Sequence, residues 1–284
     1  MSIQWYPGHM AKAAREVTES LKLVDVIIEV LDARLPASSR NPMMAEKIEH
    51  KPTVFALAKS DMADPGITDQ FVRWYTREVD MRAVPIDSLR GTGIKELISA
   101  ATALAQPKLE KLAARGIRRD TVRALIIGIP NAGKSSLINR LAKRNAVKTG
   151  DKPGVTRQKQ WIKVGNSFEL LDTPGILWPK FEDRQVALKL AWSGAIEPTL
   201  LPLEELAQEL IEWLKWVYPK ELKSRYHLSD LDNQPEEILA LIAEGRGAIL
   251  SGGLPDLHQA AEKLLRDVQT GKLGKISFDR PDQA

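Results

Sequence analysis

The chain has 284 residues, 43% hydrophobic and 27% charged, which is enough for one packed core and a second, smaller unit. It contains no cysteine, which excludes disulfides and thiolate metal sites. A formal net charge of +4 is too small to identify a partner. The N-terminus has no apolar signal region, and the most apolar early stretch, residues 23–31, is too short to span a bilayer. We therefore expect a soluble cytoplasmic protein.

The first part of the chain alternates predicted helices and strands. Residues 11–23 have helical spacing of apolar positions, and residues 24–31 form a dense apolar run typical of a buried parallel strand. Further strands are predicted at residues 53–57 and 83–86, with helix-compatible stretches between them. This alternation predicts a mostly parallel α/β sheet with helices on both faces.

The alternation continues through the middle of the chain and then stops. The next predicted elements are a helix at 93–105, a basic link at 107–120, a strand at 122–127, a helix at 134–143 and a strand pair at 160–164 and 168–171. After residue 180 only helical patterns remain, punctuated by prolines, at 184–190, 203–217, 235–244 and 258–270. We therefore predict one domain at residues 1–180 and an all-helical C-terminal domain at residues 181–284.

The segment Gly128-Ile-Pro-Asn-Ala-Gly-Lys134-Ser135 fits the phosphate-loop pattern G-x-x-x-x-G-K-[ST] between a strand and a helix. Inward-pointing N–H groups of such a loop, together with the helix N-terminus, favour phosphate anions. Lys134 is expected to reach the β- and γ-phosphates, and the Ser135 hydroxyl to bind Mg²⁺. The other expected nucleotide contacts here are Asn131, Ala132, Gly133 and Ser136.

A second motif, Asp172-Thr-Pro-Gly175, follows the last predicted strand. Asp172 is expected to hold Mg²⁺ through water, and Gly175 to bring its backbone N–H to the γ-phosphate. An isolated D-T-P-G is also a plain turn, but its position after a phosphate loop favours the nucleotide role. The two motifs resemble those of translation-factor-type GTPases. In that pattern Thr156 resembles the switch threonine that closes over Mg²⁺ and the γ-phosphate; the alternative is a threonine in a plain loop.

The segment Ala58-Lys59-Ser60-Asp61 follows a predicted strand and resembles the base reader Asn-Lys-x-Asp. Asp61 can accept hydrogen bonds from the guanine N1–H and exocyclic amine, and the Lys59 stem can pack over the ring. Ala58 lacks the amide that normally supports this region, so we expect guanine selectivity to come from Asp61. Asp87 and Ser88 match the last base-contacting loop only approximately.

The base reader here precedes the phosphate loop, whereas in an ordinary GTPase it comes last, so the order is that of a circular permutation. Together with four further segments, this order resembles the RbgA/YlqF family of ribosome-biogenesis GTPases. The segments are Asp32-Ala-Arg-Leu-Pro36, Trp5-Tyr-Pro-Gly-His9-Met10, Leu177-Trp-Pro-Lys-Phe181 and Ser251-Gly-Gly253. The resemblance implies a circularly permuted P-loop GTPase domain and a role in late maturation of the large ribosomal subunit. It further implies GTP-state binding to the pre-ribosomal particle, particle-stimulated hydrolysis, and release afterwards.

The group that orients the attacking water is not obvious. Ras-like enzymes use a glutamine after D-x-x-G, whereas this chain has Ile176 and Leu177, which cannot hydrogen-bond water. Imidazole can do so, and the resemblance assigns hydrolysis to His9, although an N-terminal histidine is also an ordinary surface residue. Asn131 either coordinates K⁺ beside the phosphates or only shapes the loop.

Contact with ribosomal RNA requires basic surface. Candidate basic segments are residues 108–123, 143–159, 220–225 and 266–275, and each is also compatible with a solvated face. Trp213, Trp216 and Tyr218 could stack on bases, but their helical spacing favours core positions. Two other functions stay open: a GTPase of another RNA-related pathway, and a nucleotide-sensing module with negligible turnover.

Overall fold

The computed structural model describes residues 15–143, 161–171, 175, 177–178, 183–196 and 202–283. The chain divides into two compact units, one comprising Met1–Glu182 with Ser277–Ala284 and the other Asp183–Ile276. In the part of the chain that is described, no helix combines the length and apolar character needed to cross a membrane.

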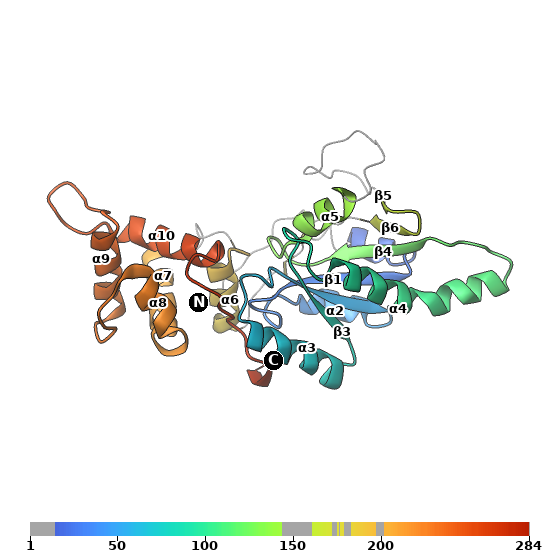
Figure 1. Ribbon diagram of the computed structural model, residues 1–284, viewed down its shortest axis with the longest axis horizontal. Helices are drawn as coiled ribbons and strands as arrows, with labels where there is room; N and C mark the ends of the chain where they lie inside the picture. Colours follow the sequence, from blue (N-terminus) through green and yellow to red (C-terminus); the bar gives the residue numbers. More distant parts are fainter. Residues whose placement is uncertain are drawn as a thin grey trace. The chain divides into compact units, whose positions relative to one another are not determined.

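The first unit is built on a six-stranded sheet with the order β3-β2-β1-β4-β6-β5 (Figure 1). All neighbouring strands pair in parallel except β5, which is antiparallel to β6. This confirms the predicted mostly parallel sheet, and the uninterrupted apolar runs are explained by burial on both faces. The strands are β1 (Val26–Asp32), β2 (Thr53–Ala58), β3 (Arg82–Ile86), β4 (Val122–Ile127), β5 (Trp161–Val164) and β6 (Phe168–Leu171).

The helices of this unit lie on both faces of the sheet because the strand order reverses once. From β1 to β3 the chain moves one way across the sheet, and from β3 to β4 it returns to the far side of β1. Right-handed crossovers therefore place α2 and α3 on one face and α4 and α5 on the other. Residues 15–20 are also helical, and the named helices are α2 (Pro42–Ile48), α3 (Pro65–Glu78), α4 (Ile94–Ala114) and α5 (Lys134–Lys143). The reversal lies between β1 and β4, where nucleotide sites of open α/β sheets form.

Helix α4 is longer than the sequence pattern indicated. The predicted helix ended at residue 105 before a basic link, but α4 continues through Pro107 to Ala114. A proline inside a helix costs a hydrogen bond, which is why the pattern suggested an end there. The last turns are mostly exposed, so a basic helix end takes the place of most of the predicted link.

A buried carboxylate lies in the sheet between two apolar clusters. Glu29 of β1 is 1% exposed, and Arg40 lies 3.7 Å away with its guanidinium over the Phe55 ring. Burial raises the pKa of Glu29 to about 7, and the charge of Arg40 opposes this only in part. The carboxyl Oε2, the Arg40 Nε and the Tyr75 hydroxyl make no hydrogen bond within the described structure. The Glu29 ion pair is therefore poorly formed.

This carboxyl should make stability depend on pH. Its folded-state pKa of about 7 lies above its ordinary value of 4.5, so the folded state binds more protons between those values. The free energy of unfolding should therefore fall as pH rises from about 4.5 to about 7, by about 2–3 kcal/mol. Urea unfolding of the wild type and of Glu29→Gln across this range measures the effect. The difference in free energy of unfolding between the two proteins isolates the contribution of Glu29. A difference that stayed constant across this pH range would contradict the expectation.

Within its described residues, 183–196 and 202–276, the second unit is helical, as predicted, with one isolated bridge between Ile249 and Pro255. Its helices are α6 (Arg184–Ser193), α7 (Leu203–Val217), α8 (Pro219–Tyr226), α9 (Pro235–Gly245) and α10 (Leu257–Gln269). α7 packs against α9 and α10 through buried leucines, and the buried Asp267 accepts hydrogen bonds from Arg225 and Tyr226. The unit thus has an apolar core of its own.

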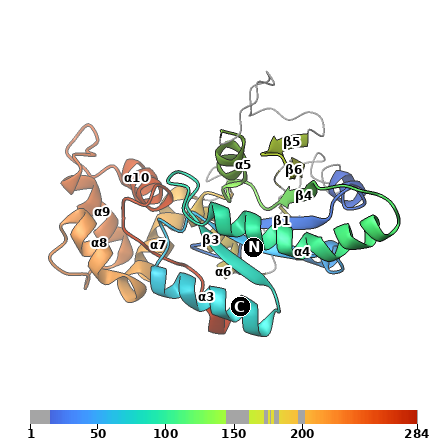
Figure 2. The same ribbon diagram turned by 45° about the vertical axis from the view of Figure 1, so that its right-hand side comes forward.

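The C-terminal segment does not belong to this helical unit. The predicted second domain extended to residue 284, whereas Ser277–Ala284 belongs to the first unit. Phe278 and Asp279 are each 2% exposed, and the 3₁₀ turn Pro281–Gln283 packs against α3, where Figures 1 and 2 place the C-terminus. Buried hydrogen bonds to the turn after β1 hold the segment there, and no local sequence pattern indicates such a return.

Candidate functional site

The phosphate loop joins β4 to α5 at the reversal of strand order. Gly128 has φ +151°, and a Cβ at this position would lie 2.4 Å from the Val30 carbonyl oxygen, so only glycine fits between the loop and β1. Lys134 is 7% exposed, and its ammonium donates to the carbonyl oxygens of Gly128 (3.0 Å) and Ile129 (2.8 Å). The lysine charge is thereby held on the loop. Ser135 and Ser136 are exposed on the first turn of α5, Asn131 is exposed and Ala132 is buried.

Gly175 of the second motif lies directly against this loop. A Cβ at Gly175 would be 2.8 Å from the Pro130 nitrogen and 2.9 Å from the Lys134 Nζ. A side chain there would displace the loop or the lysine, so glycine is required by close approach. The two motifs therefore meet in space, although Asp172, Thr156 and His9 lie outside the described residues.

The predicted base reader meets the phosphate loop from the other side. Ala58 ends β2 with 1% exposure, and its Cβ is 3.0 Å from the Cβ position of Gly133, which has φ +113°. Lys59 has φ +59°, an uncommon conformation that turns the chain at the end of the strand. Ser60 is then fixed by its N–H bond to the Ile86 carbonyl, and Asp61 is half-buried. The base reader is thus a defined turn packed on the phosphate loop.

The Asp87–Ser88 loop has its own internal order. Asp87 is buried, and its carboxylate accepts from the backbone N–H groups of Leu89 (2.8 Å) and Arg90 (3.0 Å). Arg140 of α5 donates to the carbonyls of the same two residues, which ties this loop to the helix that carries Lys134. The Asp87 side chain therefore organises the loop, and Ser88 is half-exposed.

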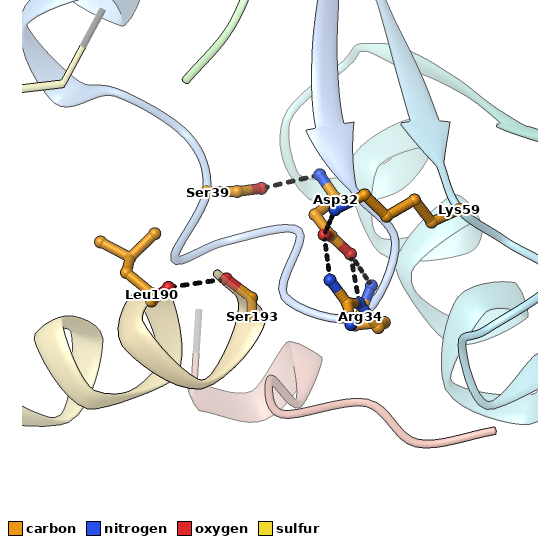
Figure 3. Close-up of polar contacts among 6 residues, drawn as sticks. All are labelled: Asp32, Arg34, Ser39, Lys59, Leu190 and Ser193. Carbon is orange, nitrogen blue, oxygen red and sulfur yellow. Dashed lines mark hydrogen bonds and ion pairs between the residues drawn. The ribbon is translucent and has the colours of Figure 1, made fainter. Parts of the chain in front are cut away.

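A buried charge network, which spacing alone did not reveal, supports the base reader. Asp32 ends β1, is 2% exposed, and accepts from the Arg34 Nε (2.9 Å) and Nη2 (2.7 Å) and from the Lys59 Nζ (2.8 Å), as Figure 3 shows. Burial by itself would raise the pKa of Asp32, but the charges of Arg34 and Lys59 overcome this and hold it well below its usual range. The carboxylate is therefore ionised and fixes Lys59. The corresponding signal in the sequence is the segment Asp32-Ala-Arg-Leu-Pro36, whose pattern indicates a family resemblance but not this network.

Comparisons with known proteins agree with this geometry. The family described as "50S ribosome-binding GTPase" matches residues 123–234, a range that includes the phosphate loop and excludes the base reader. Proteins named ribosome biogenesis GTPase A are 50% identical in Bacillus cereus, over 100% of this chain and 95% of that protein, and 48% identical in Priestia megaterium, over 100% and 99%. The chain belongs to the ribosome biogenesis GTPase A family. The GNP-bound YlqF of Thermotoga maritima superimposes with a TM-score of 0.68 at 26% identity, covering 96% of this chain and 100% of that one.

Membership in the ribosome biogenesis GTPase A family makes the chain a GTPase and confirms the permuted P-loop fold. Enzymes of this class use Mg²⁺ with few protein ligands. Of the expected Mg²⁺ ligands, Ser135 is described, and it is exposed on the first turn of α5, where its hydroxyl suits such an ion. Ser135 would hold the ion together with nucleotide phosphates, and the metal would neutralise charge developing on them.

Part of the basic surface predicted for this ribosome biogenesis GTPase is used inside the protein. Lys108 and Arg119 both pair with the buried Asp25, and Arg123 pairs with Glu169 and lies over the Trp161 ring. The exposed cations of this stretch are Lys111, Arg115 and Arg118. The second basic segment, residues 143–159, lies outside the described side chains.

The three aromatic candidates for base stacking, at the C-terminal end of α7, also include residues that pack inside the protein and one that is exposed. The Trp213 ring packs between those of Trp192 (centroids 5.9 Å apart) and Tyr218 (5.6 Å), both tilted against it, which makes it part of the packing of the second unit. Trp216 is 80% exposed, with its Nε1 hydrogen-bonded to Glu212. Of the three candidates for base stacking, Trp216 alone presents most of its ring to solvent.

Proposed function

We propose that this protein hydrolyses GTP bound between the phosphate loop and the base reader, and that it uses the reaction in late maturation of the large ribosomal subunit. The observation that carries the proposal is the convergence at the phosphate loop of two separate segments, Ala58 against Gly133 and Gly175 against Lys134. Each end of a guanine nucleotide thereby has a recognition element. Relatives named ribosome biogenesis GTPase A support the assembly role.

The phosphate half of the site comprises Lys134, Ser135, Ser136, Gly175 and the amides of residues 131–133. On nucleotide binding, we expect Lys134 to exchange its loop carbonyl bonds for β- and γ-phosphate oxygens. Asp172 and Thr156 complete the proposed Mg²⁺ shell. Asn131 has φ +57°, which suits a loop-shaping asparagine, while K⁺ coordination stays the alternative. Comparing turnover in potassium and sodium buffers separates the two.

The base half depends on Asp61. Asp61→Asn replaces an acceptor of two guanine hydrogen bonds by a group that also donates, and should therefore lower GDP affinity by at least about 100-fold and favour xanthine nucleotides. Competition binding with GDP and xanthosine diphosphate measures both. Exposed Asp69 of α3 supplies the control variant Asp69→Asn, which should bind like the wild type. Unchanged preference in Asp61→Asn would remove the base-reading assignment.

We propose that the particle completes the catalytic site by ordering His9 beside the attacking water. Leu177, one of the two residues in place of the usual glutamine, is apolar and 1% exposed, which supports a low intrinsic rate. His9→Ala should lose about 10²–10⁴-fold of particle-stimulated turnover, while basal turnover and GTP affinity stay near wild type. His258, an exposed histidine of the second unit, supplies the control His258→Ala. Full stimulation of His9→Ala would contradict this role.

Co-sedimentation with ribosomal particles tests the assembly role. We propose that the helical unit docks on ribosomal RNA, that the GTP form binds the large-subunit precursor, and that hydrolysis releases it. A non-hydrolysable GTP analogue should therefore hold the protein on the particle more strongly than GDP, and added salt should weaken this binding. Equal sedimentation in both nucleotide states would favour a GTPase of another pathway. Turnover that stays negligible with purified subunits would favour a nucleotide-sensing module.

A further inference from the structure

Three residues near the C-terminus are buried in the first unit immediately after the chain leaves the helical unit. Ser277 is 0% exposed, and Phe278 and Asp279 are each 2% exposed. Chain ends usually fray unless specific contacts hold them. Two of these side chains, Ser277 and Asp279, are polar, and their burial at a chain end implies specific hydrogen-bond partners.

The first partner is the turn that follows β1. The Phe278 N–H donates to the Arg34 carbonyl oxygen at 2.6 Å. The Asp279 carboxylate accepts from both the backbone N–H and the hydroxyl of Ser38, each at 2.7 Å. This is the turn whose Arg34 side chain holds Asp32, and Asp32 in turn holds the base-reader residue Lys59.

The second partner is the loop that follows β2. The Ser277 hydroxyl accepts from the Asp64 N–H at 3.1 Å. Asp64 lies three positions after Asp61 and is the N-cap of α3, where its carboxylate accepts from the N–H groups of Gly66 and Ile67. One short segment therefore contacts both the turn after β1, whose Asp32 and Arg34 hold Lys59, and the loop after β2, which carries Lys59 and Asp61.

We propose that Ser277 and Asp279 are positioning residues that set guanine selectivity and the rate of nucleotide release. The proposal rests on the assignment of Asp61 to the guanine. Two hydrogen bonds from one base edge to one carboxylate require accurate placement, because their strength falls steeply with distance and angle. Loosening the loop should therefore weaken binding of guanine more than binding of a base that lacks the exocyclic amine.

This difference separates positioning from general stabilisation. A contact that only stabilises the fold changes the unfolding temperature and leaves the preference between two bases unchanged. Inosine diphosphate shares every group of GDP except the exocyclic amine. The ratio of the inosine diphosphate dissociation rate to the GDP dissociation rate therefore reports how well Asp61 is placed, and it falls when the amine contact is lost.

The test measures dissociation of GDP and inosine diphosphate from full-length protein by stopped-flow displacement, together with thermal unfolding. Asp279→Ala and Ser277→Ala should each raise the GDP dissociation rate by about tenfold, and the inosine diphosphate rate less. Asp279→Asn keeps one acceptor for Ser38 and should fall between Asp279→Ala and wild type. Asp282→Ala removes an exposed carboxylate from the same segment and should behave as wild type. If Asp279→Ala does not fold, Ser38→Ala is tested in its place, because it removes the hydrogen bond from the Ser38 hydroxyl to Asp279.

The outcomes distinguish failure of this inference from failure of the base assignment. If the positioning variants lower the unfolding temperature but keep the wild-type ratio of rates, while Asp61→Asn lowers that ratio, the segment only stabilises the fold and the inference is overturned. If Asp61→Asn also keeps the wild-type ratio, Asp61 does not read the base, and both the inference and that part of the proposed function fall.

Discussion

Replacing Lys134 with alanine should reduce GTP hydrolysis by at least about 100-fold, since one preorganised cation at the transferred phosphate contributes about that much or more. The ammonium is held on the phosphate loop by the carbonyls of Gly128 and Ile129, and we expect it to exchange these bonds for phosphate oxygens when nucleotide binds. GTP affinity should fall as well, because the β-phosphate loses the same charge.

Phosphate release assays and equilibrium binding measure the two effects of this substitution. Lys95 of α4 is exposed at the start of its helix, so Lys95→Ala removes an equal charge and should leave both quantities near wild type. Wild-type hydrolysis by Lys134→Ala would exclude this loop as the phosphate site. A loss of hydrolysis with unchanged affinity would place the lysine interaction in the transition state alone.

Replacing Asp32 with alanine should lower the free energy of unfolding by about 3–5 kcal/mol, because it leaves a buried charge without its partner. Arg34 is 0% exposed and gives two side-chain bonds to this carboxylate, and Lys59 gives a third. The substitution should also release Lys59 and so weaken guanine nucleotide binding.

Urea unfolding with and without GDP separates the two consequences of the Asp32 substitution. The double variant Asp32→Ala/Arg34→Leu should recover part of the lost stability, since it also removes the unpaired buried charge. It should not recover nucleotide affinity, because Lys59 still lacks its partner. A loss below about 1 kcal/mol in the single variant would show that the buried network contributes little net stability.

The sequence by itself determined the class of fold and the motifs. Apolar runs such as residues 24–31 identified parallel strands because a doubly covered strand has no polar face. The phosphate loop was identifiable because its glycines and Lys134 are local requirements of one chain segment, and the motif order revealed the permutation. The resemblance to ribosome-biogenesis GTPases rested on the same short segments.

The tertiary structure decided which distant residues act together. No periodicity relates Asp279 to Ser38 or Lys108 to Asp25, since these pairs depend on how loops close over the sheet. Sequence reasoning ended a helix at Pro107 because it weighs a local cost, whereas α4 continues through that residue. The motifs are thus recognisable from short stretches of sequence. The buried charges and the C-terminal segment that support the base reader depend on packing between distant parts of the chain, which no single segment encodes.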